Sequence, residues 1–153
     1  METTPLETDT RRVDVKSRTV RRFTFRFDWR YRVAGKPFSV DAEHTFVEID
    51  RPDAHEPGVF RARFGPWKIE TSLDNVVATR VTGPYSVLKT IGPAHLSLAD
   101  HGLTFATNND CGVCITFKEP VPGIEPLGVL KHPALTVTVV DVEGLQDALD
   151  HLN

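Results

Sequence analysis

The sequence predicts a mainly β fold, an antiparallel barrel or sandwich of about seven to nine strands with one amphipathic helix near the C-terminal end. Three observations predict this class. Residues 23–33 alternate strictly between apolar and polar side chains. Short apolar runs then follow one another, separated by turn sequences such as Gly65-Pro66. After Asp141 the apolar period changes from two residues to between three and four.

The first of these segments, residues 23–33, has the clearest strand pattern. A period of two places alternate side chains on opposite faces of a strand. The odd positions are apolar: Phe23, Phe25, Phe27, Trp29, Tyr31 and Val33. The even positions and the residue before the segment are mostly charged: Arg22, Arg26, Asp28, Arg30 and Arg32. We therefore predict one continuous strand with buried odd positions, bent near its middle because its extended length would be roughly 35 Å.

A turn sequence, Ala34-Gly-Lys-Pro37, follows and predicts a hairpin with a second strand over residues 38–49. A four-residue loop there would place Arg30 opposite Asp41 and Phe27 opposite His44. The remaining strands are predicted at 59–64, 67–71, 76–82, 94–99, 103–107, 113–118 and 135–140.

The last element is predicted to be a helix. The carboxylate of Asp141 can cap its N-terminus. Leu145, Ala148, Leu149 and Leu152 follow at the spacing of one helical face. A helix this short is marginal alone, so we expect its apolar face to pack against the sheet.

Composition and length limit the class of protein. Residues 1–18 are polar and aperiodic and are predicted to be a mobile leader, and residues 19–153 a single β-rich domain. The net charge of −3 argues against a nucleic-acid partner. The sequence has no apolar run of membrane-spanning length and no apolar secretory signal at its start, so we expect a cytoplasmic protein with no integral membrane segment.

Two segments resemble the bacterial pleckstrin-homology-like (PH-like) domains. They are Phe60-Arg-Ala-Arg-Phe-Gly-Pro-Trp-Lys-Ile-Glu-Thr-Ser-Leu-Asp-Asn-Val76 and Leu135-Thr-Val-Thr-Val-Val-Asp-Val-Glu-Gly-Leu145. The resemblance covers about residues 38–152 and implies a strand pair leading into a turn, then a last strand running into a capping helix. It contains no catalytic motif, and fold alone does not give function. The chain also resembles an uncharacterised actinobacterial family, which implies no activity.

The arginines of the first strand are the leading candidate site. Arg22, Arg26, Arg30 and Arg32 would share one face, and guanidinium groups pair with carboxylate or phosphate. In PH domains of eukaryotes, basic residues on the first strands hold anionic head groups, so the resemblance also points to an anionic ligand. The alternative is neutralisation across the hairpin by acids of the second strand. These acids are too few for every arginine, and we predict that Arg26 is left without a partner.

Large aromatic groups suggest a second site. Trp29 and His44 would lie among other aromatic side chains on the apolar side of the hairpin, where they could line a cavity. A core histidine satisfied by one hydrogen bond is the simpler interpretation. A cavity there would favour a small-molecule enzyme or carrier over a binding module.

The cysteines give the weakest candidate. Cys111 and Cys114 have the spacing of a redox pair or half a zinc site, with His95 and His101 as further ligands. Continuation of the cysteine segment as a strand would point the two thiols to opposite faces. We therefore predict no metal, no cofactor and no catalytic residue. The predicted function is a binding or interaction module for an anionic ligand or a protein partner, of undetermined oligomeric state.

Overall fold

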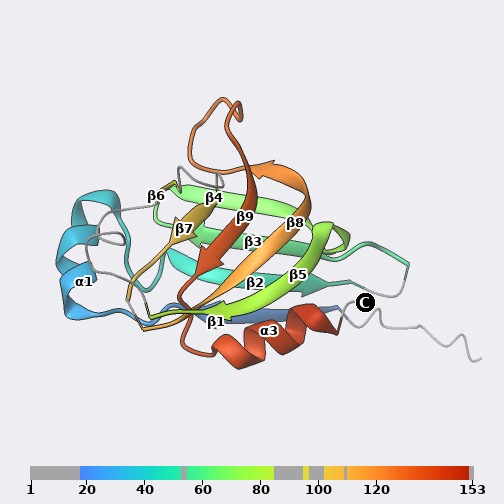
Figure 1. Ribbon diagram of the computed structural model, residues 1–153, viewed down its shortest axis with the longest axis horizontal. Coiled ribbons are helices and arrows are strands. Elements are labelled where there is room, and N and C mark those ends of the chain that lie inside the picture. Colours follow the sequence, from blue (N-terminus) through green and yellow to red (C-terminus); the bar gives the residue numbers. More distant parts are fainter. Residues whose placement is uncertain (1–17, 53–54, 85–94, 97–101, 109, 152–153) are drawn as a thin grey trace, which may run out of the picture.

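The computed structural model describes residues 18–52, 55–84, 95–96, 102–108 and 110–151 (Figure 1). These residues form nine strands: β1 Thr19–Thr24, β2 Thr45–Arg51, β3 Val59–Phe64, β4 Trp67–Ser72, β5 Val76–Thr82, β6 His95–Leu96, β7 Leu103–Phe105, β8 Gly112–Pro122 and β9 Lys131–Val137. The helices are α1 Trp29–Gly35 and α3 Val142–Asp150, with 3₁₀ turns at Lys36–Phe38 and Leu73–Asn75. The predicted leader lies outside the described residues, apart from Arg18.

Two sheets face one another as a sandwich (Figure 1). The first sheet is antiparallel with the order β1-β2-β3-β4. The second has the order β5-β8-β9-β7-β6, in which only β7 and β9 run parallel among the described strands. The mainly β class and the C-terminal helix are confirmed, and the architecture is a sandwich rather than a closed barrel.

The predicted continuous strand over residues 23–33 is wrong. Strand β1 ends at Thr24, and α1 begins at Trp29. The carboxylate of Asp28 caps this helix by accepting a hydrogen bond from the Arg30 amide at 3.0 Å. Trp29 is 69% exposed and Val33 64%, so burial of the odd positions also fails there. A capping residue and contacts with the second sheet override the period-two pattern.

The predicted hairpin at residues 34–37 is wrong for the same reason, because these residues complete α1 and enter a 3₁₀ turn. Strand β2 starts only at Thr45 and pairs with β1 in a register that places Glu48 opposite Arg22 and Val47 opposite Phe23. The Arg30–Asp41 and Phe27–His44 pairs expected from the hairpin therefore do not form. The carboxylate of Asp41 instead accepts the amides of Glu43 and His44 in a turn before the strand.

On one side of the sandwich, the residues at the end of β1 form hydrogen bonds with the residues that follow β9. The amide of Val140 donates to the carbonyl of Thr24 at 2.9 Å, and that of Arg26 donates to Thr138 at 3.1 Å. Helix α3 packs against β5 and β8 on this side (Figure 1), and Arg51 donates to the carbonyl of Ala148. On the opposite side the first sheet ends at β4. Among the described strands, β4 pairs only with β3.

The helix prediction is confirmed. The carboxylate of Asp141 caps α3 by accepting from the Gly144 amide at 2.9 Å. Leu145 and Leu149 are 0% and 1% exposed, and Ala148 is also buried. Leu152, the fourth member of the predicted stripe, lies outside the described residues.

Candidate functional site

The outer face of the first sheet has a row of alternating charges across all four strands. Arg22, Glu48, Arg61 and Glu70 occupy successive strands in direct register. The ion-pair distances between neighbours along this row are 3.0, 3.5 and 2.7 Å. Glu48 of β2 therefore neutralises Arg22 of β1, as the cross-strand interpretation expects. The acid is not one of those expected from the predicted hairpin.

Asp50 adds a second cluster beside this row. Its side chain is 5% exposed and accepts from Arg18 Nε at 2.8 Å and from Arg61 Nη1 at 3.2 Å. The hydrogen bonds from Arg18 are the main reason why the pKa of Asp50 lies below its ordinary value of 3.8, against the opposing effect of burial. The cations Arg18, Arg22 and Arg61 are thus balanced by the acids Glu48, Asp50 and Glu70, so this part of the outer face offers no excess charge for a ligand.

The other predicted arginines lie outside strand β1. Arg26 was expected to be free, but its Nη1 lies 2.8 Å from a carboxylate oxygen of Asp110, so that expectation is wrong. Arg30 lies on α1 with its guanidinium carbon 5.6 Å from the Trp29 ring centre. Arg32 is also on α1 and has no ion pair within the described part of the chain.

Trp29 and His44 do not line an internal cavity. Trp29 is largely exposed, and the His44 side chain is 38% exposed. The imidazole Nδ1 of His44 lies 2.8 Å from the Asp41 carboxylate. The pKa of Asp41 lies below its ordinary value, chiefly because its carboxylate accepts the backbone amide of His44 and secondly because of the imidazole. Both groups belong to a surface turn.

The cysteine candidates remain unsupported. Cys111 and Cys114 are free thiols of intermediate exposure. His101 lies outside the described residues, as does the side chain of His95. Among the residues that the structure describes, no three His, Cys, Asp or Glu side chains are grouped as metal ligands.

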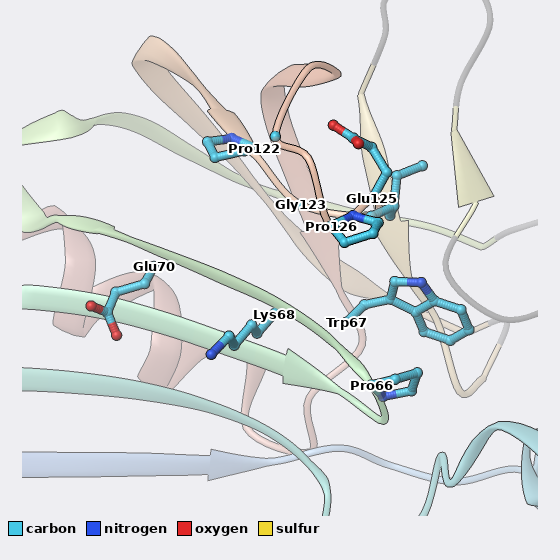
Figure 2. Close-up of a pocket in the computed structure, with 10 residues that line it drawn as sticks. Pro66, Trp67, Lys68, Glu70, Pro122, Gly123, Glu125 and Pro126 are labelled. Carbon is cyan, nitrogen blue, oxygen red and sulfur yellow. The ribbon is translucent and has the colours of Figure 1, made fainter.

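A groove of about 610 Å³ lies beside the open edge of β4 (Figure 2). One side is the start of β4 with the turn before it, and the other side is the segment that follows β8. The lining residues are Pro66, Trp67, Lys68, Glu70, Pro122, Gly123, Ile124, Glu125, Pro126 and Gly128. Its size is within the range of ordinary ligand sites, and its lining is mainly apolar with three ionisable groups.

The turn that leads into β4 explains the geometry of this edge. Gly65 has φ +60°, which suits the first central position of a two-residue hairpin turn. In such a hairpin, the residues that flank the turn, Phe64 and Trp67, form a hydrogen-bonded pair, and the pairs then alternate. Lys68 and Glu70 therefore direct their backbone amide and carbonyl groups away from β3, toward the groove.

Glu125 organises the opposite side of the groove. Its carboxylate accepts the amides of Leu127 at 2.9 Å and Leu130 at 3.0 Å, and its carbonyl accepts the amide of Gly128 at 3.4 Å. The Leu130 amide is the main reason why the pKa of Glu125 lies below its ordinary value of 4.5. The segment is thus folded around its own carboxylate, while the side chains of Leu127 and Val129 are 83% and 75% exposed.

Two cations near the groove have no acid opposite them. Arg63 is in direct register with Lys68, and the residue opposite Arg63 on β2 is Phe46. Like charges placed directly opposite each other destabilise a sheet. Neither Arg63 nor Lys68 forms an ion pair within the described part of the chain, so this end of the outer face has excess positive charge.

Sequence reasoning missed these residues for different reasons. Counting outward from the Gly65-Pro66 turn would have paired Arg63 with Lys68 and Arg61 with Glu70, so that signal was present. The role of Glu125 depends on how residues 125–130 fold back, which the Pro- and Gly-rich sequence does not fix.

The stability of the folded conformation of residues 125–130 is expected to depend on pH. Because its folded pKa is lowered, the Glu125 carboxylate stabilises this segment fully above 4.5 and loses the effect as the pH falls through the lower folded value. Amide hydrogen exchange at Leu127 and Leu130, corrected for the intrinsic rate, should therefore accelerate at low pH. Glu125→Gln should show fast exchange at neutral pH, whereas Glu143→Gln, on the exposed side of α3, should not. Unchanged protection in Glu125→Gln would contradict the assignment.

Comparisons with family models, with curated proteins and with solved structures gave no match to this chain. The resemblance to PH-like domains therefore remains a prediction from the sequence. No helix of the described residues is long and apolar enough to cross a membrane.

Proposed function

We propose that this protein is a binding module whose ligand occupies the groove between β4 and the segment after β8, and that the ligand is anionic. The observation that supports this most directly is the position of Lys68. It lines the groove and lies opposite Arg63, with no acid in register. A negatively charged ligand would relieve the repulsion between these two cations.

The chemistry of the groove favours binding over catalysis. Glu70 is paired with Arg61 at 2.7 Å, and Glu125 is occupied by backbone amides. Of the ionisable groups that line the groove, this leaves Lys68 to interact with a ligand. General acid–base catalysis needs a positioned proton donor and acceptor near the reacting group, and these two carboxylates already have structural partners.

The enzyme or carrier function that the sequence also suggested depended on a cavity near Trp29 and His44. Since both side chains lie at the surface, no observation favours that function.

Intrinsic fluorescence offers a direct test, because Trp67 lines the groove and the other tryptophan, Trp29, does not. In a Trp29→Phe background, octaglutamate should change the Trp67 emission in a saturable and salt-sensitive way, and octalysine should not. Lys68→Glu should weaken octaglutamate binding at least tenfold. The matched control is Arg80→Glu, an exposed cation on β5 outside the groove.

Two results would overturn the proposal. If octaglutamate leaves the Trp67 emission unchanged, or if the Lys68 and Arg80 variants lose binding equally, the groove is not a site for anionic ligands.

A further inference from the structure

We infer that the occupant of the groove is an extended peptide that pairs with β4 as a fifth strand of the first sheet. This inference rests on the proposed function and names the class of ligand. The amide and carbonyl groups of Lys68 and Glu70 face the groove, and no strand among the described residues pairs with them. An extended peptide satisfies such an edge with main-chain hydrogen bonds.

The opposite side of the groove does not compete for these hydrogen bonds. Pro122 and Pro126 have no amide hydrogen, and the amides of Leu127, Gly128 and Leu130 are bonded to Glu125. The backbone of Gly123 lies so close to the core that an added Cβ would be 2.8 Å from Leu103. The segment after β8 therefore borders the edge of β4 without pairing with it (Figure 2).

The lining on the far side of the groove favours one added strand rather than a second copy of this protein. Neighbouring strands in a sheet lie about 4.8 Å apart, and an added strand would have the segment after β8 on its far side. A second sheet paired through its own edge strand would need room beyond that strand, where this segment stands. A single peptide of about four paired residues matches the length from Trp67 to Glu70.

Side chains along β4 predict which peptide fits. An added strand would alternate between the outer face, beside Lys68 and Glu70, and the inner side, beside Trp67 and Ile124. The outer position at Lys68 favours Asp or Glu. The outer position at Glu70 does not favour a cation strongly, because Glu70 already pairs with Arg61. The inner positions favour apolar residues, so the pattern is apolar–acidic–apolar.

The test uses the peptide acetyl-Thr-Val-Thr-Val-Glu-Val-Thr-amide, titrated against the Trp29→Phe protein and followed by Trp67 emission. Two further peptides have N-methyl groups on the odd or on the even residues. Since alternate amides of a strand face opposite sides, one methylated peptide should bind at least tenfold more weakly, and the other within about threefold of the parent. A peptide with Lys in place of Glu should prefer the Lys68→Glu variant.

Each outcome decides the inference. If both methylated peptides bind like the parent, or both lose binding equally, strand addition is wrong. If octaglutamate binds but the alternating peptide does not, the groove is an anion site and only this inference falls. If neither binds, both proposals fall. Sedimentation would show a second copy at the β4 edge if the apparent mass rises with protein concentration and Lys68→Glu lowers it. That result would overturn the inference that a peptide occupies the groove.

Discussion

Phe64→Ala should destabilise the protein by about 3–5 kcal/mol, the usual cost of removing a buried aromatic ring. Phe64 is 1% exposed and precedes the turn between β3 and β4. Its ring stacks on Phe105 of the second sheet with 5.0 Å between centroids, and it contacts Phe25 at 5.8 Å and Trp67 at 6.5 Å. Removing it leaves a cavity between the sheets that the surrounding strands cannot fill.

Urea unfolding followed by circular dichroism would measure this loss, with the slope of the transition checked for a change in the unfolded state. Phe38→Ala is the control, since Phe38 is 42% exposed and contacts Trp67 from outside the core. The control should lose less than about 1 kcal/mol. A similar loss in both variants would mean that Phe64 does not join the two sheets.

Leu149→Ala should cost about 2–4 kcal/mol, because Leu149 is 1% exposed where α3 covers β5 and β8. A nine-residue helix has little stability of its own, so its attachment depends on this apolar face. Gln146→Ala, on the partly exposed side of α3, should change stability by less than about 0.5 kcal/mol. A loss below about 0.5 kcal/mol in Leu149→Ala, in the same denaturant experiment, would show that α3 is loosely attached.

The elements that sequence reasoning predicted correctly are those whose local signals agree with their environment. The β3–β4 hairpin has Gly65 at a position of positive φ, and α3 has both a cap at Asp141 and an apolar stripe. Residues 23–33 failed because two local signals conflict. The alternation favours a strand, whereas Asp28 is a good N-cap. Hydrogen bonds from the amides of Arg26 and Asp28 to residues just after β9 and β7 decide the outcome.

Neutralisation of Arg22 across the strands was predicted in kind, but the acid that pairs with it was not. Acids across the strands neutralise Arg22, as cross-strand pairing implies, but the error in register moved every expected partner. The groove could not be predicted, because it is formed by β4 and a segment about fifty residues later in the chain, and their proximity is a property of the whole sandwich.

The hydrogen bonds between residues 24–26 and residues 138–140 have a consequence for biosynthesis. Strand β1 leaves the ribosome early, but its partner at Val140 is made more than a hundred residues later. At roughly 5–20 residues per second, translation alone separates them by on the order of ten seconds. During that interval the edge of β1 that Val140 later covers is exposed. The nascent chain therefore depends most on chaperones before the last strand emerges. Truncation before residue 138 should yield an aggregating product rather than a smaller domain.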